Sequence, residues 1–290
     1  MILVTGATGT NGRLVVDALR HAGAEVRAMV QGQAKSAGLA DAEVEIVTAD
    51  FDKPATLTTA LAGIERALLL SAVDQQLVER EARFVEAARK AGVRHLVKFS
   101  VIGGHPAASF TFGRQHGQAE QIVMDSGLTF TLVQPNFFMQ NLLWSVDRIK
   151  TRGELASTLE TGRASHVDAR DIASVVAATL TQPIDRHAGS VHLVTGPAAL
   201  TFAEIAETFS RVLERSVRYV NRTDEQSKAG LLASGKSDWY ATAEVELGIY
   251  ARRGHASVVT DTVERLTGHA AGTLEKWVRT YAAAFRSSPM

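Results

Sequence analysis

A glycine-rich segment near the N-terminus has the residue types and the spacing to hold a diphosphate. Residues 5–12 read TGATGTNG and follow a short apolar run at 2–4. Glycine lets the backbone turn tightly, and it lets a ligand approach where a Cβ would block it. The apolar pattern after the segment predicts a helix, whose first N–H groups and dipole favour an anion at this point. The chemistry that this segment favours is binding of the pyrophosphate of a dinucleotide.

The spacing of the glycines is G-x-x-G-x-x-G, whereas ordinary dinucleotide-binding dehydrogenases carry G-x-G-x-x-G. A plain turn between a strand and a helix is therefore an alternative interpretation. The segment lies directly after the first expected strand and before the first expected helix. That position favours the dinucleotide site over the plain turn.

Strands and helices alternate along the first half of the chain, which predicts βαβ units and a parallel sheet. The expected strands are 2–4, 25–30, 44–48, 67–70, 96–100 and 130–133. The expected fold class is α/β, a Rossmann-like doubly wound parallel sheet with a small, mostly helical C-terminal lobe. Residues 1–150 would form the nucleotide-binding domain. Residues 151–290 would form the substrate lobe, packed on the first domain and interleaved with its sheet.

Polar residues follow several of the expected strands. Gln31, Asp50, Ser71 and Ser100 each stand at or just beyond a carboxyl end. In an open parallel sheet, ligands bind beyond these ends, at the point where the strand order reverses. The sequence therefore predicts that these residues and the glycine segment line one cleft.

Composition limits the other functions. The chain has 290 residues, of which 46% are hydrophobic, enough for a sizeable core. Its 31 acidic and 31 basic residues balance, and no basic block predicts nucleic-acid binding. Cysteine is absent, which excludes a disulfide framework, a thiolate metal site and a cysteine nucleophile. No apolar run is long enough for a membrane span, and a signal peptide has no room before the first strand. We therefore expect a cytoplasmic protein with no membrane or nucleic-acid partner.

Several motifs together resemble the NmrA-like branch of the atypical short-chain dehydrogenases/reductases. Besides the glycine segment they are AARKAGV at 87–93, QPNFFM at 134–139, VDARDIA at 167–173 and LVTGP at 193–197. Nearly the whole chain matches that layout. Members of this branch bind NAD(P). Some reduce quinones, triphenylmethane dyes or related aromatic compounds, whereas others are redox sensors that regulate a partner.

The resemblance implies which residues contact a cofactor. Residues of the glycine segment would hold the pyrophosphate, Asp50 and Phe51 would flank the adenine, and Ser71 would face the nicotinamide ribose. Phe99 would border the nicotinamide, with 135–137 on its far side. The expected cofactor contacts are Gly6, Thr8, Gly9, Thr10, Asn11, Gly12, Gln31, Lys35, Asp50, Phe51, Ser71, Ala72, Val73, Phe99, Ser100, Pro135, Asn136 and Phe137.

The proton chemistry departs from the wider pattern of short-chain dehydrogenases. These usually carry Tyr-x-x-x-Lys after the fifth strand, and the matching positions here are Phe112 and His116. Phe112 has no proton to give, and Ile102 falls near the place of the usual serine. His116, with an unperturbed pKa of about 6.5, could donate a proton or hold the ribose, and quinone-reducing relatives are similar in having His here. The alternative is a histidine that only hydrogen-bonds a ribose or Glu120.

Cofactor choice depends on the end of the second expected strand. An acidic residue there would bind the ribose 2′-hydroxyl of NAD, and an arginine would accept the 2′-phosphate of NADP. Gln31 is neither. Lys35 and Arg13 are positive groups that could reach a phosphate, although a solvated loop charge is an equal interpretation of Lys35. The expected cofactor is NADP or NAD, with a slight preference for NADP inherited from the family.

Aromatic residues are candidates for the walls of a pocket that takes a flat substrate. The candidates are Phe137, Phe138, Trp144, Trp239 and Tyr240. The neighbouring Leu142 and Leu143 are interpreted as core. No metal is expected, because His166 and Asp168 lack a third ligand at a suitable spacing and a helix cap explains Asp168.

Two functions stay open after this reasoning. One is an NAD(P)H-dependent reductase that delivers hydride to a quinone or another conjugated aromatic carbonyl substrate. The other is a nucleotide-binding redox sensor without turnover. The reductase is favoured, because the C-terminal helices and aromatic residues could enclose a substrate pocket. The sequence does not give the oligomeric state, and a homodimer is left open.

Overall fold

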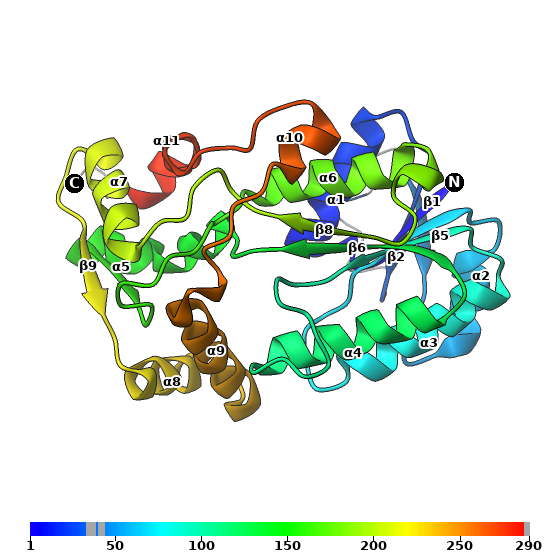
Figure 1. The fold of residues 1–290 in the computed structure, drawn as a ribbon, viewed down its shortest axis with the longest axis horizontal. Helices are drawn as coiled ribbons and strands as arrows, with labels where there is room; N and C mark the ends of the chain where they lie inside the picture. The colour runs from blue at the N-terminus through cyan, green and yellow to red at the C-terminus, as the bar shows by residue number, and fades with distance from the viewer. Residues whose placement is uncertain (33–38, 40–43, 287–290) are drawn as a thin grey trace.

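A parallel sheet organises the fold of the computed structural model, which describes residues 1–32, 39 and 44–286 (Figure 1). Within these residues the sheet has seven strands in the order β3-β2-β1-β4-β5-β6-β8. Every neighbouring pair of strands is parallel. The chain order reverses between β1 and β4, and such a reversal opens a crevice at the carboxyl ends of the strands.

The elements alternate along the chain as a doubly wound fold requires. The strands of the large sheet are β1 (Ile2–Val4), β2 (Val26–Val30), β3 (Glu45–Thr48), β4 (Arg66–Leu69), β5 (His95–Phe99), β6 (Thr129–Pro135) and β8 (Ser190–Val194). The helices that cover it are α1 (Thr10–His21), α2 (Pro54–Leu61), α3 (Leu77–Lys90), α4 (Thr111–Asp125), α6 (Ala169–Thr181) and α10 (Thr262–Thr267).

Helices cover both faces of the sheet (Figure 1), and two apolar layers hold them there. On one face, buried side chains of α1, α6 and α10 pack with alternate residues of the strands, such as Ile2 and Val4. On the other face, side chains of α2 and α3 and Val123 of α4 pack with Leu3, the residue between Ile2 and Val4. The period of two along β1 therefore sends successive side chains into different cores.

The C-terminal lobe is mostly helical and carries a second, two-stranded parallel sheet. Its elements are η2 (Met139–Ser145), α5 (Val146–Arg152), β7 (Glu154–Ser157), α7 (Phe202–Leu213), β9 (Arg218–Asn221), α8 (Asp224–Ala233), α9 (Asp238–Tyr250), η4 (Ala251–His255) and α11 (Leu274–Phe285). A short 3-10 turn, η3 (Ile184–Arg186), precedes β8. A third apolar core joins α5, α7 and α11 and surrounds Trp277.

The predicted α/β fold with a doubly wound parallel sheet and a helical C-terminal region is confirmed. The structure adds β7, β9 and α8, which the hydrophobic pattern did not predict. Strands β7 and β9 are only four residues each, and α8 buries none of its side chains, so neither has a strong periodic signal. Three elements that follow residue 150, α6, β8 and α10, complete the large sheet and its cover. Within the described part of the chain, no helix has the length and apolar character to cross a membrane.

Candidate active site

A cavity of about 1170 Å³ runs along the carboxyl ends of the strands, from the glycine turn to helix α9. Small-molecule pockets usually hold roughly 300–1,000 Å³, so this cavity has room for more than one small ligand. The large sheet, η2, α4 and α9 all contribute to its walls. It occupies the crevice that the strand order predicts.

Most of the residues selected from the sequence lie on this one cavity. Trp239 does not line it and instead packs edge-on against Phe112, with ring centroids 5.9 Å apart. Lys35 lies outside the described residues. The predicted residues that line the cavity are Gly6, Thr8, Gly9, Thr10, Asn11, Gly12, Gln31, Asp50, Phe51, Ser71, Ala72, Val73, Phe99, Ser100, His116, Pro135, Asn136, Phe137, Phe138, Trp144 and Tyr240.

The glycine turn passes so close to its neighbours that side chains are excluded at two positions. A Cβ on Gly12 would lie 2.1 Å from the carbonyl oxygen of Gly6, and a Cβ on Gly6 would lie 2.7 Å from that of Leu70. Gly6 also has φ +62°, which glycine adopts without strain. Gly9 differs, because a Cβ there would come no closer than 3.4 Å to the carbonyl of Gly6. The turn is therefore a tight backbone cradle with one more open position.

Helix α1 begins at this turn without a side-chain cap. Gly9 is the N-cap residue, and no described side chain accepts a hydrogen bond from the first turn. The first N–H groups of a helix have no partner within the helix, so here they are left for a ligand. Arg13 donates from Nε to the Thr8 carbonyl at 3.0 Å, which places a positive group beside the turn. A backbone cradle, free N–H groups and a nearby guanidinium fit a pyrophosphate.

A second polar feature lies behind the cavity wall. Lys98 of β5 is 0% exposed and Glu81 of α3 is 1% exposed. The Lys98 ammonium is 2.9 Å from Glu81 Oε2. It also donates to the carbonyl of Phe99 at 2.7 Å and to Nδ1 of His116 at 3.1 Å. The Ser71 hydroxyl donates to Glu81 Oε1 at 2.8 Å, so the network reaches the cavity at Ser71 and at His116.

The bond from Lys98 decides the form of His116. An ammonium only donates hydrogen bonds, so Nδ1 of His116 accepts and its proton is on Nε2. Burial lowers the pKa of His116 well below its usual value, and the Lys98 charge lowers it further. The sequence-based expectation used the unperturbed pKa, at which the ring would titrate near neutral pH. In the structure the ring is a neutral imidazole that offers an N–H.

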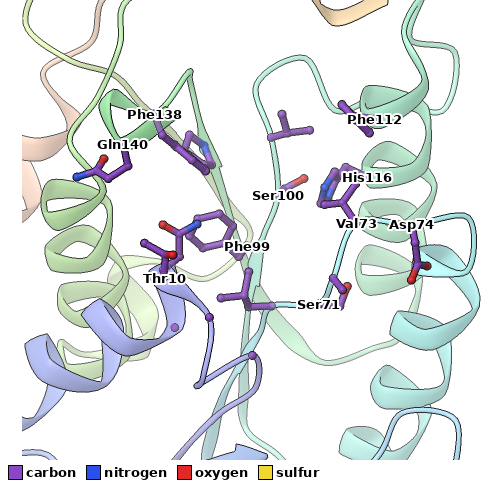
Figure 2. Close-up of a pocket in the computed structure, with 18 of the residues that line it drawn as sticks. Thr10, Ser71, Val73, Asp74, Phe99, Ser100, Phe112, His116, Phe138 and Gln140 are labelled. Atoms are coloured by element: carbon purple, nitrogen blue, oxygen red, sulfur yellow. The ribbon is translucent and has the colours of Figure 1, made fainter. Parts of the chain in front are cut away.

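His116 and Phe112 project from α4 into the cavity, opposite Phe138 and Gln140 (Figure 2). Ser100 faces His116 across this space. Glu120 lies one turn further along α4 and accepts a hydrogen bond from the Gln134 amide at 2.8 Å. Burial raises the pKa of Glu120. In the structure His116 is hydrogen-bonded to Lys98, and not to Glu120 as in the alternative that the sequence left open.

The comparisons with known proteins agree with this geometry. The NmrA-like family matches residues 1–246. The chain belongs to the NmrA-like family. It is 39% identical over 285 residues to an NAD(P)H azoreductase of Xenophilus azovorans, covering 98% of this chain and 99% of that protein.

Two solved structures extend the likeness of this NmrA-like chain to the whole fold. An NADPH-dependent quinone oxidoreductase of Escherichia coli in complex with NADPH is 26% identical, with a TM-score of 0.89 over 97% of this chain and 100% of that one. A triphenylmethane reductase of Citrobacter sp. complexed with NADP(H) is 25% identical, with a TM-score of 0.84 over 97% and 99%. The family predicted from the sequence motifs is confirmed.

Asn136 lines the cavity of this NmrA-like chain, but its side chain is used within the protein. Its amide donates to the Ser165 hydroxyl at 2.6 Å and to the Ala256 carbonyl at 2.8 Å. Its oxygen accepts from the Phe137 N–H at 2.9 Å. Asn136 therefore ties the end of β6 to the C-terminal lobe, and it presents Phe137 to the cavity.

Sequence reasoning missed three side chains of this region: Glu81, Lys98 and Glu244. Lys98 interrupts an apolar strand, and an isolated lysine in such a strand is a signal that a buried partner exists. Glu244 lines the cavity with Tyr240 and Leu247, at positions i, i+4 and i+7 of α9. That spacing puts all three on one helix face, so the signal for Glu244 was present once Tyr240 was selected. Among the described residues, no three His, Asp or Glu side chains gather as a metal site.

Proposed function

We propose that this chain is an NAD(P)H-dependent reductase that transfers hydride to a quinone, a dye or another conjugated aromatic acceptor. The observation that carries the proposal is the length of the cavity, which continues from the glycine turn past His116 to Phe112 and Tyr240. A nucleotide-binding sensor needs only the first part. The named activities of the similar proteins, azoreductase and quinone oxidoreductase, support the reductase.

The residues present fit a dinucleotide cofactor. A Cβ added at Gly12 would lie 2.1 Å from the Gly6 carbonyl oxygen, and one added at Gly6 would lie 2.7 Å from the Leu70 carbonyl oxygen. Neither position has room for a side chain, so the turn keeps a bare backbone surface. We propose that this surface and the first turn of α1 hold the pyrophosphate, and that Asp50 and Phe51 flank the adenine. Bound there, the reduced cofactor would supply hydride to the acceptor. We expect NADP to be slightly preferred over NAD, because the two solved relatives are complexed with NADPH and NADP(H).

The remaining residues act on the acceptor and on the end of the cavity where hydride transfer occurs. His116 presents Nε2–H and can stabilise negative charge that grows on an acceptor oxygen or nitrogen, with no change in its own protonation. Phe99 and Phe138 contact edge to face, with centroids 6.3 Å apart, and form an apolar wall for a flat ring. Phe137, Trp144 and Tyr240 complete the proposed acceptor pocket.

The test is a screen for oxidation of NADPH and NADH with quinones, azo dyes and triphenylmethane dyes, beside calorimetry of nucleotide binding. We expect turnover with at least one class, and dissociation constants for the two nucleotides within about tenfold, or about 1.4 kcal/mol. Gly9→Asp is the negative control, because it sets a carboxylate where the pyrophosphate would lie. Tight binding by wild type with no turnover on any acceptor would favour the sensor.

Two further expectations from the sequence stay predictions. They are a nucleotide-binding domain that ends near residue 150 and a cytoplasmic location. A thermal-unfolding trace with two separate transitions would support the first. Light scattering would decide between a monomer and the homodimer that the sequence leaves open.

A further inference from the structure

One wall of the cavity comes from helix α9, whose inward face carries Tyr240, Glu244 and Leu247. Helix α9 packs against α4 (Figure 1). The Tyr240 ring lies 5.7 Å from the ring of Phe112, the α4 residue at the position where related enzymes carry their proton-donating tyrosine. The C-terminal lobe thus brings polar groups beside Phe112, which has none.

Tyr240 and Glu244 form a hydrogen-bonded pair one helical turn apart. The Tyr240 hydroxyl donates to Glu244 Oε1 at 2.7 Å. Oε2 of the same carboxyl is bonded by no other residue in the described part of the chain. Glu244 is half-buried, and it lines the cavity. One oxygen is therefore fixed, and the other is left for a ligand.

The surroundings of Glu244 favour its protonated form. Burial raises the pKa of the Glu244 carboxyl, against the smaller effects of the Tyr240 hydroxyl and the Lys236 charge. Burial also raises the pKa of Tyr240. Lys236 lies 5.2 Å from the centre of the Tyr240 ring. On the α4 side the facing groups are His116, which is neutral, and the Arg114 guanidinium. Arg114 is paired with Glu246 rather than with Glu244.

We propose that Glu244 is the proton donor of the reductase and that Tyr240 positions its carboxyl. The inference rests on the proposed function, and it supplies the proton donor that the reductase otherwise lacks. His116 keeps its proton on Nε2 and is held neutral, so it can stabilise charge but is a weak source of a proton. Glu244 is a catalytic residue in this account, and Tyr240 is a positioning residue.

The reduction of an azo bond shows how the atoms balance. One nitrogen accepts a hydride with its electron pair from the reduced nicotinamide, which is thereby oxidised. The other nitrogen accepts a proton from Glu244, and N=N becomes HN–NH. The electron pair of the broken O–H bond stays on the Glu244 carboxylate, which the Tyr240 hydroxyl then stabilises. Solvent returns the proton after the product leaves.

Acceptors differ in how much they need this proton. A reduced azo bond without a proton is a strongly basic nitrogen anion. A reduced quinone is a delocalised, much weaker base. A triphenylmethane dye is a cation that becomes a neutral molecule on taking hydride alone. The importance of Glu244 should therefore fall in the order azo dye, quinone, triphenylmethane dye.

The test compares Glu244→Gln with wild type on methyl red, menadione and crystal violet. We expect turnover of methyl red to fall about a hundredfold, the usual contribution of general acid catalysis. Turnover of menadione should fall by less, and turnover of crystal violet should fall by about twofold or less. The dissociation constant of NADPH should stay unchanged. Asp238→Asn is the matched control, since it removes a carboxylate from the same helix that is 73% exposed and paired with Lys228.

A second readout needs no turnover. Infrared titration of the protein alone should show a carboxyl that titrates above the usual range of a glutamate and that disappears in Glu244→Gln. In Tyr240→Phe its titration should move to higher pH, because the hydrogen bond from the Tyr240 hydroxyl favours the carboxylate. Equal losses on all three acceptors, or methyl red turnover at the wild-type rate, would overturn the assignment of Glu244. A wild type that reduces none of the three acceptors would instead overturn the reductase, and the infrared band would still report the state of Glu244.

Discussion

The two ends of the cavity are built by different means. The end at the glycine turn is backbone, made by one run of consecutive residues whose side chains are absent or small. The end at His116 is made of side chains from β5, α3, α4 and α9, and it depends on a charge pair that is almost fully removed from water. The first end can be broken by adding atoms, whereas the second is broken by removing a charge.

Removal of the Lys98 charge should have the largest effect of all. Lys98→Met leaves Glu81 buried without its cation, and breaking such a pair typically costs about 3–5 kcal/mol of the free energy of unfolding. The loss should shrink at acidic pH, where Glu81 takes up a proton. Urea unfolding measures it. Adding Glu81→Gln to Lys98→Met should restore much of the stability, and a loss below about 1 kcal/mol in the single variant would mean that the pair is replaceable by water.

An added methyl group tests the other end. Gly12→Ala places a Cβ 2.1 Å from the Gly6 carbonyl oxygen, so the turn must open. We expect NADPH affinity to fall by more than about a hundredfold, or about 2.7 kcal/mol. Gly9→Ala is the matched control, because its Cβ has 3.4 Å of room, and it should stay within about tenfold of wild type. Calorimetry distinguishes them, and similar affinities for the two variants would contradict the close-packed turn.

The same difference explains how much the sequence could predict. The glycine turn was readable because its requirement is local: a strand, a spacing of glycines and a helix follow one another within a few residues. The parallel sheet was readable for a similar reason, since each βαβ unit carries its own periodic pattern. The prediction that Gln31, Asp50, Ser71 and Ser100 line one cavity then followed, because parallel strands bring their carboxyl ends to one edge.

The end at His116 could be predicted only in part. His116 was found from its place after the fifth strand, but its protonation state depends on Lys98, which is 18 residues away in sequence and reaches it only through the fold. Helix α9 is more distant still, and it meets α4 at a hydrogen bond between Glu246 and Thr111 across 135 residues. No periodic pattern reports such contacts. Tyr240 was selected as an aromatic wall, and its pairing with Glu244 needed the structure.

Substitution of His116 should change turnover at its end of the cavity without changing NADPH binding at the glycine turn, and the expected effect is smaller than those above. A neutral N–H donor contributes about one hydrogen bond, so His116→Phe should lower the turnover number roughly tenfold, or about 1.4 kcal/mol. The NADPH affinity set by the glycine turn should stay unchanged. His116→Gln can keep a donor and should recover part of the rate.

The pH profile checks the same assignment. Because burial lowers the pKa of His116 well below its usual value, the ring is neutral on both sides of pH 6.5. Wild-type turnover should therefore show no step near pH 6.5 that His116→Phe removes. Such a step would mean that the ring is charged in the working enzyme, and it would return the role of acid to His116.

The smallest effect is expected at Trp144, on the rim of the cavity in η2. Its side chain is 73% exposed, so it contributes little to the folded core. A large ring held at a cavity edge can cover one face of a flat acceptor, and a partly exposed contact of this kind contributes about 0.5–1 kcal/mol. Trp144→Ala should therefore raise KM for an aromatic acceptor about two- to fivefold, while NADPH affinity and the free energy of unfolding stay at wild-type values. Steady-state kinetics with a flat quinone and with a small aliphatic one test this, because only the flat acceptor should respond. An equal rise of KM for both would show that Trp144 shapes the entrance rather than stacking on the ring.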